Sequence, residues 1–258
     1  VVRAACMSGR SAIRHLALVG IGTGSPGHMT QAGIAALNAA DVILIPRKGA
    51  DKADLADLRR ALCAGAVTNP ATALVEFDLP ARDEGTADYL ARVEDWHDAI
   101  AAAWVAALAG RGGRVALLVW GDPALYDSSL RIASRLSPAP QVEMIPGITA
   151  LQALTAAHRV PLNALAGAVT ITTGRRLRDR GWPPDCDRLA VMLDADCAFR
   201  TLDPGGLRIW WGAFLGMPGQ ALEAGPLAEA GPRILARRPA LRAAHGWIMD
   251  TYLLARDP

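Results

Sequence analysis

Asp122 stands at a position where a carboxylate could serve a ligand. It lies between Gly121 and Pro123, shortly after the apolar run Val115–Val119. Such a run predicts a buried parallel strand, and ligands bind beyond the carboxyl ends of these strands. Gly121 allows close approach to the backbone, and Pro123 ends the strand because it lacks an N–H donor. We therefore expect the Asp122 carboxylate to face a sulfonium, an ammonium group or ribose hydroxyls, unless it only accepts hydrogen bonds from its own turn.

A glycine-rich loop, GIGTGSPG, is a second candidate for ligand binding. Residues 22–27 have the GxGxxG spacing of dinucleotide sites, in which phosphate contacts a helix N-terminus. Two features oppose this interpretation. Pro26 stands where a phosphate-binding loop offers an N–H, and the next predicted strand ends in Pro46-Arg47 rather than in an acidic residue. A nicotinamide-dependent oxidoreductase, a non-catalytic nucleotide-binding module and a purely structural turn stay open as alternatives.

The composition is that of a globular protein. Of 258 residues, 52% are hydrophobic and 20% charged, and the formal net charge is +2. This balance predicts no nucleic-acid partner, and no uncharged stretch reaches the roughly 20 residues of a membrane helix. The first apolar run is short, so we expect no signal peptide and a cytoplasmic location. The opening VVRAACMSGRS (residues 1–11) fits no element. We interpret it as a tag remnant or an upstream start, with Met7 as the expected first residue.

The cysteines predict neither a metal site nor a disulfide framework. They are widely spaced and none belongs to a CxxC pair. We expect reduced cysteines that pack in the interior, and no bound metal. The four residues are Cys6, Cys63, Cys186 and Cys197.

The first half of the chain alternates between predicted strands and helices. A strand at residues 16–20, a helix capped by Thr30 and a strand at 41–45, stopped by Pro46, predict a βαβ unit. Apolar spacing then predicts helices at 51–66 and 86–108, the strand Val115–Val119, a helix from about Ser128 and the strand–turn–helix segment QVEMIPGITALQALTAAH.

A fresh series of strands follows, joined by stretches rich in proline and glycine. We place these strands near residues 168–173, 189–193, 207–211 and 247–254. The change predicts a boundary near residues 159–165. We therefore expect an N-terminal α/β domain over residues 12–160 and a C-terminal α/β domain over residues 161–258.

Four blocks in this order resemble the tetrapyrrole methylases. They are LALVGIGTGSPGHMT, VWGDPALYDSS, MIPGITALQALTAAHRVPL and VTITTGRR, and the resemblance extends from about Leu16 to Arg256. Thr23 and Ser25 stand where that family usually has proline and aspartate. The resemblance implies an S-adenosylmethionine-dependent methyltransferase with two α/β domains, a cofactor cleft between them, and usually a homodimer.

The resemblance also implies which residues bind the cofactor. Each is carried over from the position that matches the family's motif. The implied residues are Trp120, Gly121 and Asp122 at a strand end, Thr149 and Ala150 in the Pro-Gly turn, and Leu193, Ala213 and Thr251 at strand ends of the second domain.

Three further segments resemble one branch of this family: FDLPARDEGTADYLARVEDWHDAI, RIWWGAFLG and HGWIMDTYLL. That branch acts in cobalamin biosynthesis, where it methylates C-1 of precorrin-5 and expels the acetyl group as acetate to give precorrin-6A. The substrate is a small tetrapyrrole that carries many carboxylates, so arginines are expected to bind it.

Basic residues are almost all arginine, which suits a carboxylate-rich substrate or simply reflects a GC-rich genome. Arg175 and Arg176 follow a predicted strand and are the first candidates for binding substrate carboxylates, with Arg47 next; solvated loops are the alternative for all three. Trp120, Trp210 and Trp211 could form an apolar wall for the macrocycle or belong to the core.

The expected reaction needs no metal, but the loss of acetate requires an activated water and stabilisation of an oxyanion. The candidates by residue type are His97, Tyr126, Asp194 and Asp196, and none is assigned. His97 lies on a predicted helix as a packing or surface residue would, and Asp194 could simply cap the next turn. Methylation of another precorrin, of ribosomal RNA or of a translation factor also stays open, as does a non-catalytic scaffold.

Overall fold

A computed structural model describes residues 13–47, 53–82 and 88–256. The chain forms two compact units. The first consists of residues up to Ile21 together with Met29–Gly147, and the second consists of Gly22–His28 and Ile148–Pro258. The opening segment with Cys6 and Met7, and the first residues of the predicted helices 51–66 and 86–108, lie outside the described residues.

The sheet of the first unit has five strands, all paired in parallel, in the order β3-β2-β4-β1-β5. The carboxyl ends of its strands therefore lie at one edge. The strands are β1 (Ile13–Gly20), β2 (Val42–Arg47), β3 (Ala73–Asp78), β4 (Gly113–Val119) and β5 (Gln141–Ile145).

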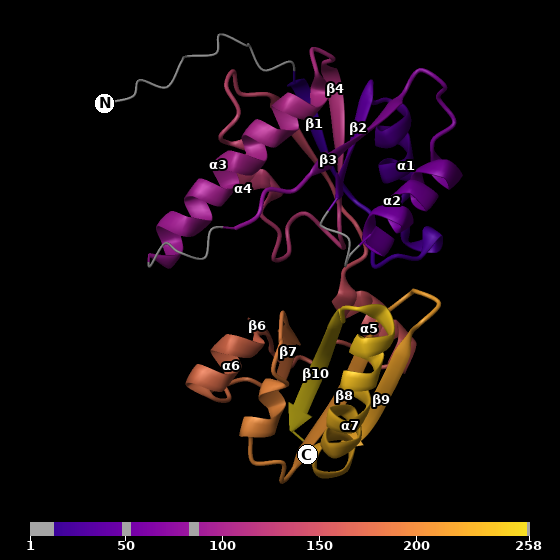
Figure 1. Ribbon diagram of the computed structural model, residues 1–258. Helices are drawn as coiled ribbons and strands as arrows, with labels where there is room; N and C mark the ends of the chain where they lie inside the picture. Colours follow the sequence, from indigo (N-terminus) through magenta and orange to yellow (C-terminus); the bar gives the residue numbers. More distant parts are fainter. Residues whose placement is uncertain (1–12, 48–52, 83–87, 257–258) are drawn as a thin grey trace. The chain divides into compact units, whose positions relative to one another are not determined.

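Helices cover both faces of this sheet (Figure 1). One apolar cluster packs Trp104 of α3 (Tyr89–Leu108) and Ile132 of α4 (Ser129–Ala133) against one face. A second cluster packs Leu37 of α1 (Gln31–Asn38) and Leu62 of α2 (Ala53–Ala66) against the other. Burial on both sides explains why the central strands are apolar throughout rather than alternating.

The second unit is built on a mixed sheet in the order β6-β7-β10-β8-β9. β6 and β7 are parallel, whereas β10 runs antiparallel to both β7 and β8, and β9 runs antiparallel to β8. The strands are β6 (Val169–Thr173), β7 (Arg188–Met192), β8 (Leu207–Ala213), β9 (Ala221–Pro226) and β10 (Asp250–Arg256).

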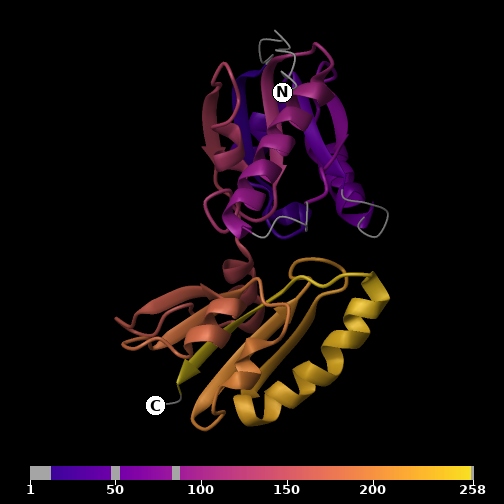
Figure 2. The same cartoon turned by 60° about the vertical axis from the view of Figure 1, so that its left-hand side comes forward.

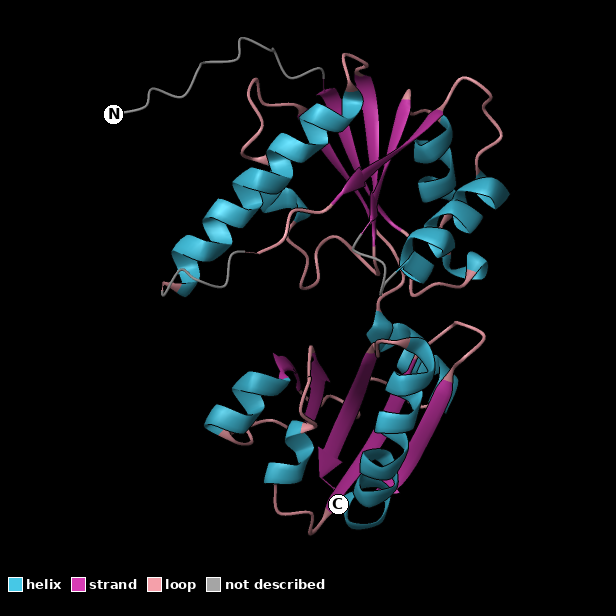
Figure 3. Cartoon of the chain, in the orientation of Figure 1, coloured by secondary structure: helices cyan, strands magenta, loops and turns pink. Residues whose placement is uncertain are grey.

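Three α-helices and two 3-10 turns complete the described part of this unit; one of these turns is η1 (Pro26–His28) in the glycine loop. Figures 2 and 3 show the helices beside the sheet. α5 (Ala150–His158) contacts β8, β9 and β10, and α7 (Leu227–His245) packs against β8 and β9. α6 (Gly174–Arg180) contacts the 3-10 turn η3 (Ala198–Thr201). Both units thus combine helices with a sheet, as the sequence predicts.

Three features of the fold differ from the sequence predictions. β2 continues through Pro46 to Arg47 because its pairing with β4 ends at Leu44, so no ladder hydrogen bond on that side needs the missing N–H. The last strand begins at Asp250 rather than near residue 247. The units divide before α5 at Gly147 and Ile148, whereas the predicted boundary lay after this helix.

Candidate active site

Three strands of the first unit have a glycine at or just beyond their carboxyl end. Gly20 ends β1, Gly121 lies just beyond β4, and Gly147 lies just beyond β5. A Cβ atom built on Gly20 would lie 2.6 Å from the Gly147 nitrogen and 2.8 Å from the Gly121 oxygen, and one on Gly147 would collide with the Gly121 oxygen. Only glycine fits at Gly20 and Gly147, so the backbone of this edge carries no side chain at its centre.

Asp122 joins the turns that follow β4 and β5. Its Oδ1 atom accepts a hydrogen bond of 2.7 Å from the Ala124 nitrogen, and its Oδ2 atom accepts one of 2.9 Å from the Gly147 nitrogen. The carboxylate therefore does satisfy its own turn, which was the alternative from the sequence, and it also fixes the Gly147 turn. A carboxylate has about four acceptor positions, so it keeps capacity for a ligand.

The loop after Asp122 contains Tyr126, one of the predicted catalytic candidates. Tyr126 has a left-handed backbone with φ of 52° and a side chain that is 44% exposed. A non-glycine residue in this region is strained by about 1–3 kcal/mol and must be held by its surroundings. Trp120, directly after β4 and before Gly121, is half-buried, and the Cζ atom of Arg59 lies 5.9 Å from its ring centroid.

Leu193, Ala213 and Thr251 lie at one end of the second sheet. β10 is antiparallel to β7 and β8, so its first residues lie beside the carboxyl ends of those strands. Thr251 is opposite Gly212, and its hydroxyl donates to the Val191 carbonyl at 2.7 Å. Leu193, directly after β7, has φ of 52° and is 66% exposed. Ala213 and Thr251 are buried, so of these three only Leu193 exposes a large side chain.

Thr149 and Ala150 form the beginning of α5. The Thr149 side chain caps this helix by accepting a hydrogen bond of 3.4 Å from the Gln152 nitrogen, and the Gln152 side chain returns to the Thr149 backbone at 2.7 Å. This reciprocal pair is a capping box. The Thr149 hydroxyl therefore has a structural function in the helix N-terminus.

The glycine loop Gly22–His28 groups with the second unit and holds a threonine–histidine pair. Thr23 Oγ1 lies 3.0 Å from His28 Nδ1. A Cβ atom built on Gly216, three residues after β8, would lie 2.7 Å from His28 Cε1 and 3.0 Å from Thr23 Oγ1. The pair therefore lies near the carboxyl end of β8, where burial lowers the pKa of His28. His28 was not among the residues predicted from the sequence; its spacing from Thr23 within one tight loop is the available signal.

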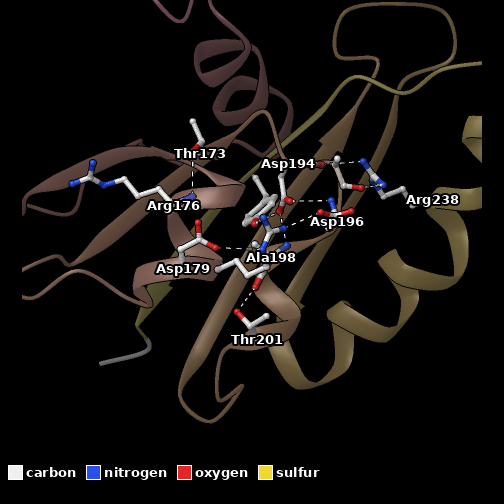
Figure 4. Close-up of polar contacts among 11 residues, drawn as sticks. Thr173, Arg176, Asp179, Asp194, Asp196, Ala198, Thr201 and Arg238 are labelled. Carbon is white, nitrogen blue, oxygen red and sulfur yellow. Dashed lines mark hydrogen bonds and ion pairs between the residues drawn. The ribbon is translucent and has the colours of Figure 1, made fainter. Parts of the chain in front are cut away.

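Asp194 is buried and its carboxylate is extensively hydrogen-bonded (Figure 4). It accepts from the Ala198 nitrogen at 2.6 Å, the Asp196 nitrogen at 3.1 Å and the Tyr252 hydroxyl at 2.6 Å. A Cβ atom on Gly174 would collide with this carboxylate. Burial, followed by the charge of Asp194, raises the pKa of Tyr252. Asp194 therefore stabilises the loop after β7, as the turn-capping interpretation predicted.

Arg238 of α7 also stabilises the loop after β7. Arg238 Nε donates to Asp250 Oδ2 at 2.8 Å, and Arg238 Nη2 donates to the Asp194 carbonyl at 3.0 Å (Figure 4). Asp196, another candidate from the sequence, forms an ion pair of 2.8 Å with Arg178. The carboxylates of this region thus have partners within the second unit.

His97 lies on the buried face of α3 and is 2% exposed. Neither ring nitrogen has a hydrogen-bond partner among the described residues. Burial, and then the nearby charges of Arg135 and Arg131, lower its pKa and favour the neutral ring. This environment agrees with the packing interpretation.

The predicted substrate arginines differ in their partners. Arg47 forms ion pairs with Asp78 at 2.9 Å and with Glu76 at 3.6 Å. Arg175 and Arg176 lie in the first turn of α6 with exposed side chains, and the Arg176 nitrogen donates to Thr173 Oγ1 at 3.3 Å.

Of the tryptophans proposed as an apolar wall, Trp211 is a core residue. It is fully buried, and its Nε1 donates to Asp250 at 2.8 Å. Trp210 is half-buried under Arg188, whose Cζ atom lies 5.7 Å from its ring centroid.

Cys63, Cys186 and Cys197 are buried free thiols. Within the described residues no cluster of His, Cys, Asp and Glu is arranged to hold a metal ion. No helix in that part of the chain has the length and apolarity to cross a bilayer.

Comparisons with known proteins agree with this architecture. The model of the tetrapyrrole (corrin/porphyrin) methylases matches residues 15–231. A precorrin-6A synthase (deacetylating) from Sinorhizobium sp. is 46% identical over 251 residues, which cover 95% of this chain and 96% of the relative. A precorrin-2 C(20)-methyltransferase from Sinorhizobium sp. is 32% identical over 173 residues, which cover 63% of this chain and 69% of that protein.

A solved structure extends this similarity to three dimensions. The crystal structure of a cobalamin synthesis related protein (CobF) from Corynebacterium diphtheriae is 36% identical with a TM-score of 0.80, covering 96% of this chain and 100% of that one. These matches, together with the two α/β units, show that the chain belongs to the tetrapyrrole (corrin/porphyrin) methylases.

Proposed function

We propose that the chain is an S-adenosylmethionine-dependent C-methyltransferase of cobalamin biosynthesis. It methylates C-1 of precorrin-5 and releases the acetyl group at that carbon as acetate, giving precorrin-6A. The observation that carries this proposal is the 46% identity to a precorrin-6A synthase (deacetylating) along 95% of the chain. The CobF relative, which matches 96% of the chain, supports the same pathway.

The strand ends of the chain fit a nucleotide cofactor. Gly20, Gly121 and Gly147 leave the centre of one sheet edge without side chains, so a ligand can approach the backbone there. Asp122 stabilises this edge and retains acceptor capacity for a cationic or hydroxyl group. Bound S-adenosylmethionine supplies a methyl group on a positively charged sulfur, which is an electrophile. We assign Trp120, Gly121, Asp122, Thr149, Ala150, Leu193, Ala213 and Thr251 to its binding.

The protein contributes position and electrostatics to the transfer. Holding the electron-rich ring carbon in a fixed geometry removes an entropic cost from the reaction. The tetrapyrrole carries several carboxylates, and Arg175 and Arg176 expose guanidinium groups on α6 that can bind them. Arg47 is a weaker choice because Asp78 and Glu76 already neutralise it.

We assign the deacetylation base to His28. Asp194 already accepts three hydrogen bonds, and His97 is enclosed in the packing of α3, so neither is available to a substrate-bound water. His28 is half-buried, its ring is oriented by Thr23, and its lowered pKa keeps it neutral and able to take a proton. The water adds to the acetyl carbonyl, and the carbon–carbon bond breaks as acetate leaves. The electron pair of that bond stays with C-1 and the ring, and C-1 uses it to form the bond to the methyl group. Deacetylation therefore precedes methylation, because C-1 has no free valence while it carries the acetyl group.

The decisive experiment is mass spectrometry of the chain incubated with precorrin-5 and S-adenosylmethionine. We expect one added methyl group and one equivalent of released acetate. Methylation of another precorrin without acetate would reassign the substrate within the family. Methylation of ribosomal RNA or of a translation factor, or NADPH binding without methyl transfer, would replace the proposal with the corresponding alternative.

We further propose that the enzyme is a cytoplasmic homodimer, the usual state of the family it resembles. Light scattering coupled to size-exclusion chromatography should give twice the chain mass. A monomeric mass at micromolar concentration would contradict the dimer.

A further inference from the structure

Arg59 is a partly buried arginine beside the Gly-Asp-Pro loop of the first unit. It lies on α2, and its guanidinium Cζ is 5.9 Å from the centroid of the Trp120 ring. Trp120 directly precedes Gly121 and Asp122, so Arg59 is a neighbour of the carboxyl end of β4. Arg59 was not predicted from the sequence, because only the packing of α2 on the sheet brings it there.

The N–H donors of the Arg59 guanidinium have few hydrogen-bond partners among the described residues. Its Nη1 atom donates to the Leu55 carbonyl, one turn earlier on the same helix, at 3.2 Å. Its Nε atom is enclosed and has no hydrogen-bond partner among the described residues. An arginine side chain offers five N–H donors in a planar fork that matches a carboxylate. Among the described residues, the guanidinium thus has one backbone acceptor and one enclosed N–H without a partner.

Arg59 also lacks the counter-charge that its neighbours have. Arg60, the next residue, pairs with Glu76 at 2.5 Å and with Asp57. Arg59 has no ion pair within the described part of the chain, and Asp127 affects it only through longer-range attraction. Burial lowers the pKa of Arg59 to about 10, with the attraction of Asp127 as the smaller, opposing effect. Buried charges in proteins are normally paired, so an unpaired guanidinium next to a candidate site indicates a missing anion.

We propose that Arg59 binds a carboxylate of a bound ligand beside Trp120. This inference rests on the proposed function, in which two ligands carry carboxylates: the amino-acid part of S-adenosylmethionine and the side chains of the tetrapyrrole. Either carboxylate would supply the missing counter-charge and form a bidentate, charge-assisted hydrogen-bonded pair with the guanidinium. Trp120 would hold the guanidinium plane in position through its ring face.

The test uses Arg59→Met, which keeps the length of the apolar stem and removes the charge. The matched control is Arg60→Met, one residue away on the same helix, whose wild-type side chain is already paired with Glu76. Binding of S-adenosylhomocysteine and of 5′-methylthioadenosine, which lacks the amino-acid carboxylate, is measured by calorimetry, and KM is measured for precorrin-5. Unfolding curves verify that each variant is folded.

The two sources of the carboxylate give different results. If the cofactor supplies it, Arg59→Met weakens S-adenosylhomocysteine binding by about 10- to 100-fold and leaves 5′-methylthioadenosine binding unchanged. If the tetrapyrrole supplies it, both nucleoside affinities stay at the wild-type value and KM for precorrin-5 rises by a similar factor. In both cases Arg59→Lys recovers part of the loss and Arg60→Met matches the wild type.

The proposal is overturned if folded Arg59→Met matches the wild type in both affinities and in KM, while the wild type binds S-adenosylhomocysteine and methylates precorrin-5. An equal loss in Arg60→Met would overturn it as well, because the effect would then belong to α2 as a whole. A wild type that neither binds S-adenosylhomocysteine nor methylates precorrin-5 would instead contradict the proposed function.

Discussion

Asp122 and Gly147 are connected by a hydrogen bond of 2.9 Å from the Gly147 nitrogen to Asp122 Oδ2. The bond links the turns after β4 and β5, which lie on either side of β1 in the sheet. Asp122 therefore stabilises the backbone at this edge of the sheet whether or not a ligand is bound. A loss of function on removing this carboxylate would combine both effects, and a test must separate them.

Asp122→Ala should weaken both the fold and cofactor binding. It leaves the nitrogens of Ala124 and Gly147 without their acceptor, so we expect a loss of about 1–3 kcal/mol in the free energy of unfolding. The affinity for S-adenosylhomocysteine should fall as well. The control is Asp203→Ala, which removes a similar turn bond to the Gly205 nitrogen at 3.0 Å. Unchanged affinity in a folded Asp122→Ala protein would remove this residue from the cofactor site.

Gly147→Ala should destabilise the first unit. The new methyl group would collide with the Gly121 oxygen, a backbone atom that cannot rotate away, and overpacking of this kind costs about 1–3 kcal/mol. Gly65→Ala is the opposite control, since nothing lies within 4 Å of a Cβ atom there and the position is inside α2. We expect that variant to gain about 0.5–1 kcal/mol from helix propensity. Urea denaturation of both variants measures the difference, and equal stabilities would contradict the packing described at the strand ends.

The pH dependence of stability should contain a contribution from His97. Its folded pKa lies below the ordinary value of 6.5, so the unfolded chain takes up the proton more readily. The associated stability is present above pH 6.5 and is lost as the pH falls below it. His97→Phe keeps the ring and removes the titration, so its unfolding free energy should fall less than that of the wild type between pH 7.5 and pH 5.5. Parallel curves for the two proteins would show that His97 is not responsible.

His28→Gln should slow acetate release and methyl transfer together. C-1 cannot accept the methyl group while the acetyl group occupies its fourth bond, so unreacted precorrin-5 should accumulate, whereas S-adenosylhomocysteine binding should stay at the wild-type value. Thr23→Val removes only the partner at 3.0 Å that orients the ring, and we expect a smaller effect of the same kind. Mass spectrometry measures acetate and transferred methyl, and calorimetry measures the affinity. Acetate release at the wild-type rate in folded His28→Gln would exclude His28 as the base for deacetylation.

The sequence predicted the parallel core of the first unit because strands buried on both faces are apolar throughout. Two edge strands, β3 and β9, were missed, whereas the edge strands β5 and β6 were predicted. β3 (ALVEFD) is mostly half-exposed, so it has no continuous apolar run. α7 was missed because Pro232 and Pro239 lie inside it. Both prolines are exposed, so water can satisfy the carbonyls that lose their helical partners.

The candidate site was predictable where it depends on local sequence. The Gly-Asp-Pro turn placed Asp122 at the end of β4, and Thr149 begins a helix as the Pro-Gly turn indicated. The partner of Asp122 Oδ2 was not predictable, since Gly147 reaches it only through the strand order of the sheet. Arg59 was equally hidden, because its position beside Trp120 comes from packing between elements that are far apart in the chain.

The segment Gly22–His28 groups with the second unit although β1 and α1, which flank it, belong to the first. The polypeptide consequently passes from one unit to the other at residues 21–22, 28–29 and 147–148. Neither unit is a single uninterrupted stretch of chain, so proteolytic nicking after Gly147 would yield a C-terminal piece deprived of the Thr23–His28 pair. Recombination that exchanges the C-terminal part between two related genes would have a similar effect. The second unit would then have to pack against a Gly22–His28 segment that comes from a different protein.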